Sequence, residues 1–218
     1  MHATLASMQG ALAEIYDLAA TPDVAQFLMT DRASVAGFEV ARESDEQLIV
    51  AQEDDGISLA LYIDAAVLER LSDRDPRAAL NQENLADYLT VAEGVSHFVY
   101  VAWNAGFDKP VTLLELELQA EVDKYVLCAW LLREQGRGRF PCELHRALFE
   151  RARIDPTAAA GRVRLYHMAS NYAGKFCRRV AASLAHGTRG ATRELLAELR
   201  RFYRWGNARK LRHIERFA

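Results

Sequence analysis

Two long segments, residues 84–105 and 112–134, carry apolar side chains on nearly every face if they are helical. A helix that is apolar all round is buried on several sides, because each of its faces must be shielded from water. Gly106 and Pro110 bracket a short turn between the two segments. The sequence therefore predicts a helical hairpin at the centre of a bundle, and this hairpin limits the folds open to the chain.

Between residues 37 and 64 the apolar spacing changes to the two-residue period of strands. Residues 46–53 and 57–64 are joined by Asp54, Asp55 and Gly56, which are typical of a hairpin turn. With 37–43 as a further strand, the segment predicts a small antiparallel meander. Helical spacing predicts further helices on both sides, over residues 5–19, 24–28, 65–71, 142–152, 157–185 and 191–205, with a basic tail after Gly206.

The predicted fold class is α+β, mostly α, with a small antiparallel β meander at the N-terminal side packed on a helical bundle. We expect a small α/β region over residues 1–83 and a helical bundle with a basic C-terminal helix over 84–218, or one continuous domain. No run is long enough for a membrane span, and the first residues lack the features of a signal peptide. We therefore expect a cytoplasmic protein without a membrane partner. Three widely spaced cysteines without a CxxC pair are interpreted as free thiols.

The net charge of −3 conceals two opposite halves. Residues 1–124 hold 23 acidic and 7 basic side chains, whereas residues 125–218 hold 7 acidic and 20 basic ones. Such a division favours attraction within the chain, attraction between copies of it, or binding of an external polyanion.

Charged side chains also lie on the two apolar helices. Glu93 and His97 are four residues apart and share a helix face, and Glu117 and Glu121 repeat that spacing on the second helix. Carboxylates and imidazoles facing one another in a bundle can bind a divalent metal. Neither an HExxH motif nor the Glu-x-x-His pairs of di-iron bundles are present, so buried polar groups that bridge helices remain the competing interpretation.

His167 is a further catalytic candidate beside Glu93 and His97. It follows Arg162 by five positions, and this Arg-x4-His spacing resembles the motif of the HEPN helical ribonucleases. The resemblance implies an arginine that holds a phosphate and a histidine that transfers a proton. It covers only these residues, and Val163 stands where that motif has a polar residue.

The carboxyl end combines positive charge with aromatic rings, a pairing that favours phosphate contacts and base stacking. The candidate contact residues are Arg200, Arg201, Arg204, Trp205, Arg209, Lys210 and Arg212. Two other interpretations compete: a solvated face whose aromatic rings are core, or an arm docked on the acidic half of the same or a neighbouring molecule.

We expect a binding or regulatory protein whose basic C-terminal helix engages nucleic acid or an acidic protein surface. The alternative is a helical-bundle hydrolase or nuclease that uses the Glu/His cluster, with a divalent metal as its cofactor. A third possibility is an assembly protein that forms homo-oligomers through its opposite charges.

Overall fold

The computed structural model describes residues 2–19, 21–35, 37–38, 44–53, 56–136, 143–150, 160–185 and 189–216. The chain forms two compact units, which are described separately below. The first contains Met1–Glu14 and Leu18–Pro110, and the second contains Ile15–Asp17 and Val111–Ala218.

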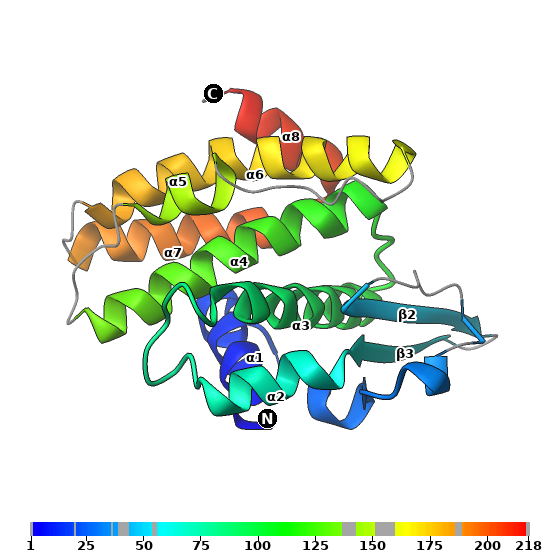
Figure 1. Ribbon diagram of the computed structural model, residues 1–218. Helices are drawn as coiled ribbons and strands as arrows, with labels where there is room; N and C mark the ends of the chain where they lie inside the picture. Colours follow the sequence, from blue (N-terminus) through cyan, green and yellow to red (C-terminus); the bar gives the residue numbers. More distant parts are fainter. Residues whose placement is uncertain are drawn as a thin grey trace. The chain divides into compact units, whose positions relative to one another are not determined.

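Most of the described chain is helical, with one small sheet (Figure 1), which confirms the predicted mostly α class of α+β fold. The helices are α1 (His2–Tyr16), α2 (Ala65–Asp73), α3 (Leu85–Ala105), α4 (Leu113–Gln135), α5 (Leu144–Phe149), α6 (Ala160–Ala185), α7 (Arg189–Arg204) and α8 (Asn207–Glu215). The strands are β1 (Leu28–Met29), β2 (Glu46–Glu53) and β3 (Gly56–Ile63), and the short 3-10 helices are η1 (Val24–Phe27) and η2 (Arg32–Val35).

The sheet has the order β1-β3-β2 and is mixed. Strands β2 and β3 form the predicted antiparallel hairpin, with Glu46 opposite Ile63 and Glu53 opposite Gly56. The prediction of a fully antiparallel meander is wrong, because β1 pairs with β3 in parallel. A two-residue strand is too short to show a period in the sequence, and turn residues reveal only the pairing of consecutive strands. The strand predicted at residues 37–43 lies mostly outside the described residues.

In the first unit, α3 packs on β2 and β3, and α2 packs on α3. Leu61 of β3 and Val95 of α3 are fully buried in this core. Asp64 ends the sheet segment and begins α2, since its carboxylate accepts a hydrogen bond of 2.9 Å from the Ala66 backbone N–H, as expected for a helix N-cap. The sequence-based division at 83/84 grouped α3 with the bundle, whereas this helix shares its unit with the sheet.

In the second unit, α6 packs along α4, and α5, α7 and α8 each pack on α6. Phe176 of α6 and Phe202 of α7 stack with ring centroids 4.0 Å apart, and both rings are buried. The residues after Gly206, predicted as a tail, form helix α8. Within the described residues, no helix combines the length and apolar character needed to cross a bilayer.

Candidate functional site

Helix α8 is fixed to the second unit at its first residue. Gly206 precedes the helix and supplies no side-chain cap. The Glu115 carboxylate of α4 instead accepts a hydrogen bond of 2.9 Å from the Asn207 backbone N–H. Glu115 is only 2 % exposed, and a carboxylate is favoured at the positive end of a helix dipole. An acid of α4 is therefore used to hold the N-terminus of α8.

The inner face of α8 contributes Lys210 to a buried polar network. Lys210 is fully buried, and its Nζ donates a 2.6 Å hydrogen bond to Oε1 of Gln119. Gln119 in turn donates from Nε2 to Oδ1 of Asp123 over 2.7 Å, and the Tyr16 hydroxyl donates to the same oxygen. Lys210 therefore does not lie on an external surface, although the sequence placed it among the contact residues, and we leave it out of the proposed interface.

The same network shifts the pKa of neighbouring groups. Burial, followed by the charge of Asp123, raises the pKa of the Tyr16 hydroxyl well above its usual range. Burial and the charges of Glu121 and Asp123 raise the pKa of the Cys177 thiol in the same direction. These groups are held neutral, so they support the packing of the unit and offer no reactive nucleophile at neutral pH.

The outer face of α8, together with its C-cap residue Arg216, carries three arginines. Arg209, Arg212 and Arg216 are spaced by three and four residues, so they lie on one side of the helix, away from buried Lys210 and Ile214. They line an open pocket of about 780 Å³ together with Trp205, His213 and Glu215. Three guanidinium groups against one carboxylate give the pocket lining an excess of positive charge.

Aromatic rings hold the pocket in place. The Arg209 guanidinium lies 4.6 Å from the centre of the Trp205 ring, which is cation–π geometry. The His213 ring meets the Trp205 ring edge-on, with centroids 4.8 Å apart. His213 Nε2 also lies 3.0 Å from a Glu198 carboxylate oxygen. The same oxygen forms an ion pair with Arg179 at 2.9 Å. The base of the pocket is therefore positioned by contacts from α6 and α7.

The arginines of α7 occupy different environments. Arg200 Nε donates to the Ile15 carbonyl over 3.0 Å, and Arg204 donates to the carbonyls of Tyr16 and Asp17 over 3.0 and 2.9 Å. These carbonyls end α1, where a positive charge is favoured by the helix dipole. Arg200 and Arg204 therefore hold the end of α1. Arg201 is exposed.

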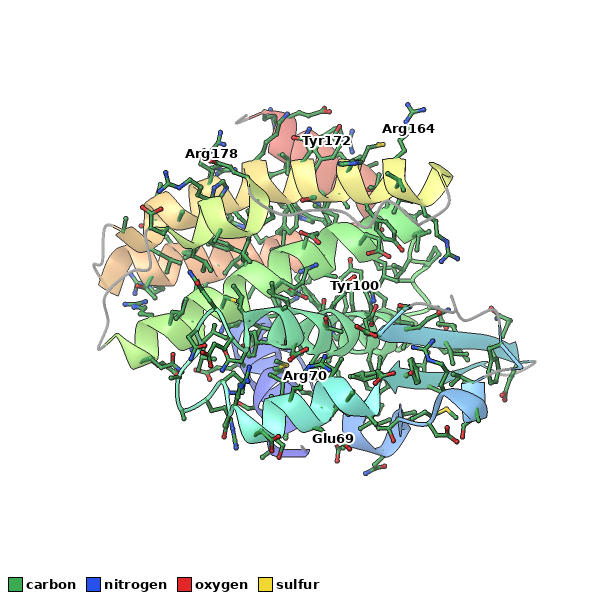
Figure 2. All side chains as sticks on the ribbon, viewed as in Figure 1. Glu69, Arg70, Tyr100, Arg164, Tyr172 and Arg178 are labelled. Carbon is green, nitrogen blue, oxygen red and sulfur yellow. The ribbon has the colours of Figure 1, made fainter. Side chains whose placement is uncertain are left out.

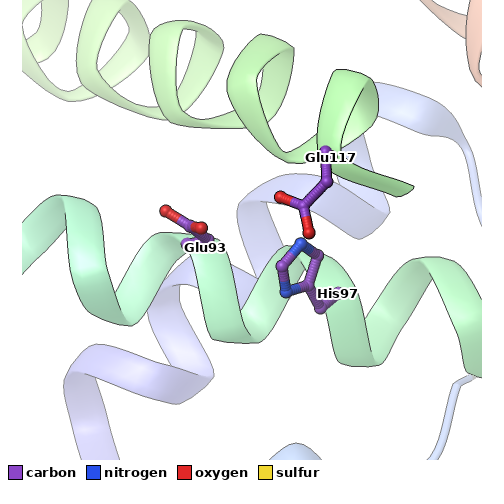
Figure 3. A group of neighbouring side chains, drawn as sticks. All are labelled: Glu93, His97 and Glu117. Atoms are coloured by element: carbon purple, nitrogen blue, oxygen red, sulfur yellow. The ribbon is translucent and has the colours of Figure 1, made fainter. Parts of the chain in front are cut away.

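The Glu/His candidates are divided between the units. Glu93 and His97 lie one turn apart on α3 of the first unit, with a carboxylate oxygen and a ring nitrogen within 4.8 Å (Figure 3). Glu117 and Glu121 lie on α4 of the second unit, where Glu121 pairs with Lys124 over 2.5 Å. His167 is exposed on α6. Of these candidates, Glu93 and His97 are the glutamate and histidine that lie close together within one unit.

A functional candidate that sequence reasoning missed is Glu46 at the start of β2. Its Oε1 lies 3.6 Å from Nδ1 of His97, and both side chains are largely buried. Gly94 makes this approach possible, because a Cβ at that position would lie 2.9 Å from Glu46 Oε2. Gly94 inside a long apolar helix was the available signal, since glycine there marks a close approach by another group.

Comparison with known proteins finds no matching family model, no matching curated protein and no matching solved structure.

Proposed function

We propose that the protein binds single-stranded nucleic acid through the outer face of α8. The observation that carries this proposal is the open pocket that Arg209, Arg212 and Arg216 line together with Trp205. Guanidinium groups bind phosphate oxygens in a bidentate manner, and their planes, like indole rings, stack on bases. A surface with both features suits a strand whose phosphates and bases are accessible together.

The charge of the second unit supports the same function. Several of its acids are already paired inside the unit, as Glu115 is with the N-terminus of α8 and Glu121 is with Lys124. The arginines of the pocket have only Glu215 as an acidic neighbour in its lining, and this carboxylate accepts a 3.0 Å hydrogen bond from Tyr172. The pocket therefore has a positive surplus for an external ligand.

The test is the affinity for a fluorescent single-stranded oligonucleotide of about 12 nucleotides, a length within the usual site size of such proteins. We expect Arg209→Gln, Arg212→Gln and Arg216→Gln, combined in one variant, to weaken binding at low salt by at least about tenfold. Each phosphate contact that is lost lowers the number of counterions released from the strand on binding. The substituted side chains lie on the outer face of α8, so the fold should persist.

The control variant removes the same charge from exposed arginines that do not line the pocket. Figure 2 shows one of them, Arg164, projecting outward from α6. The control substitutions are Arg74→Gln, Arg77→Gln and Arg164→Gln. Equal weakening in both variants would show that the effect depends on overall charge and not on the pocket. A wild-type protein that binds an acidic peptide but no oligonucleotide would show that the partner is an acidic protein and not nucleic acid.

The predicted alternative, a hydrolase or nuclease with Glu93, His97, Glu117, Glu121 and His167 as its site, stays a prediction. Figure 3 draws three of its residues. Its candidate ligands Glu93 and His97 both lie on α3 of the first unit.

A further inference from the structure

We propose that Glu93 and His97 of α3 bind one divalent transition-metal ion, with Glu46 of β2 as the residue that orients His97. This inference does not depend on nucleic-acid binding by α8. The metal class follows from the donors, since an imidazole nitrogen and a carboxylate oxygen suit borderline ions such as Zn²⁺ and Co²⁺.

The two ligands have the spacing of a chelating pair. Glu93 and His97 lie four residues apart on a regular helix, so their side chains leave the same face one turn apart. A carboxylate oxygen and a ring nitrogen come within 4.8 Å of each other. Rotamer changes that bring the two atoms to about 3.4 Å let one ion bind both with tetrahedral bonds of about 2.0–2.2 Å. His97 is 5 % exposed and Glu93 is partly exposed, so an ion could reach the pair from the Glu93 side.

Glu46 gives the imidazole a defined orientation. Its carboxylate lies 3.6 Å from Nδ1 of His97, so in the proposed site Nε2 is the nitrogen that binds the metal. Histidine ligands commonly direct their second ring nitrogen to a carboxylate, because this contact fixes the tautomer and strengthens the ligand. The Glu46 side chain reaches α3 over the bare Cα of Gly94, where any larger residue would meet Glu46 Oε2 at 2.9 Å and Leu61 Cδ1 at 3.0 Å. The glycine therefore keeps the space that the orienting carboxylate occupies.

The experiment titrates the metal-free full-length protein with Co²⁺ and with Zn²⁺. Calorimetry gives the stoichiometry and the affinity, and the visible absorption of Co²⁺ reports the ligand atoms. We expect one ion per chain, removed by a chelator, and a weakening of at least tenfold in both Glu93→Gln and His97→Gln. If His97→Gln does not fold, the less buried Glu93→Gln decides.

Glu46 is a positioning residue, and its test needs a readout beyond stability. We expect Glu46→Gln to weaken metal binding by about 10–100-fold and to alter the Co²⁺ spectrum, as is usual for such outer partners. Gly94→Ala should weaken binding in the same direction by displacing the carboxylate. The control changes the same residue type as Glu93 at an exposed position, Glu69→Gln on α2.

Two results would overturn the proposal. The first is a wild-type protein that shows no stoichiometric binding of either ion. The second is wild-type affinity in Glu93→Gln and His97→Gln, or a loss in Glu69→Gln as large as the loss in those variants. Neither result bears on the oligonucleotide assay, so the two proposals fail independently.

Discussion

Replacement of Lys210 tests the buried network that holds α8. Lys210 is fully buried and donates to Gln119, which donates to Asp123. In Lys210→Met the volume of the side chain is nearly conserved, so lost packing should cost less than about 1.5 kcal/mol of unfolding free energy. Removal of one charged member from a buried network leaves the other uncompensated and costs about 3–5 kcal/mol of unfolding free energy. We therefore expect a loss of that size.

A double-mutant cycle separates the charge effect from packing. Asp123→Asn keeps the shape of the side chain and removes its charge. If the two buried charges compensate each other, the double variant should lose less unfolding free energy than the sum of the two single losses. The difference should be at least about 2 kcal/mol. Urea unfolding measures this in a Trp103→Phe background, so that the fluorescence comes from the second unit.

The matched control is Lys175→Met, because Lys175 is an exposed lysine of the same unit. Its effect should stay within about 0.5 kcal/mol. Single losses below about 1 kcal/mol at Lys210 and Asp123, or losses that add without coupling, would refute the idea that the network carries compensating charges.

Two further predictions follow from the packing of single residues. Gly94→Ala should destabilise the first unit by about 1 kcal/mol in thermal or urea unfolding, since overpacking against Glu46 and buried Leu61 costs more than the gain in helix propensity. Gly10→Ala on α1, where a Cβ meets nothing within 4 Å, should instead stabilise the protein. If Gly94→Ala were the more stable of the two variants, the close approach of Glu46 to Gly94 would be contradicted. Burial raises the pKa of the Cys128 thiol from about 9 to about 12, so its contribution to stability is complete below pH 9 and is lost as the pH rises from 9 to 12. Cys128→Ala should reduce that alkaline loss of unfolding free energy, and rapid alkylation of native Cys128 at pH 8 would contradict the burial of the thiol.

Much of the fold is predictable from local patterns. The hairpin of β2 and β3, the start of α2 at Asp64 and the long helices α3 and α4 follow from alternation, capping and apolar spacing. The parallel pairing of β1 does not follow from such patterns, because it depends on residues distant in the sequence. The grouping of α3 with the sheet cannot be predicted from local patterns either. The sequence of a helix that is apolar on all faces does not indicate which neighbouring element covers it.

The candidate site shows a similar limit. The positive charge and aromatic rings after Trp205 are visible in the sequence, but their division into faces requires that the segment be helical. Once α8 is a helix, its period places Arg209 outward and Lys210 inward. Glu46 could not be connected to His97 by spacing, because strand and helix are far apart in the chain.

The charge asymmetry of the sequence has two parts in the structure. Some charges of α4 and α8 are used inside the second unit, as in the contacts of Glu115 and Lys210. The arginines on the outer face of α8 carry part of the remaining positive charge, and this part is the basis of the proposed function.

The salt dependence of oligonucleotide binding tests the central proposal most directly. Three phosphate contacts on a single strand predict a slope of about −2 for the logarithm of the binding constant against the logarithm of salt concentration. We expect that slope in the wild type, and a slope near zero when Arg209, Arg212 and Arg216 are all replaced by glutamine. The same slope in both proteins, or binding that does not depend on salt, would contradict nucleic-acid recognition by α8.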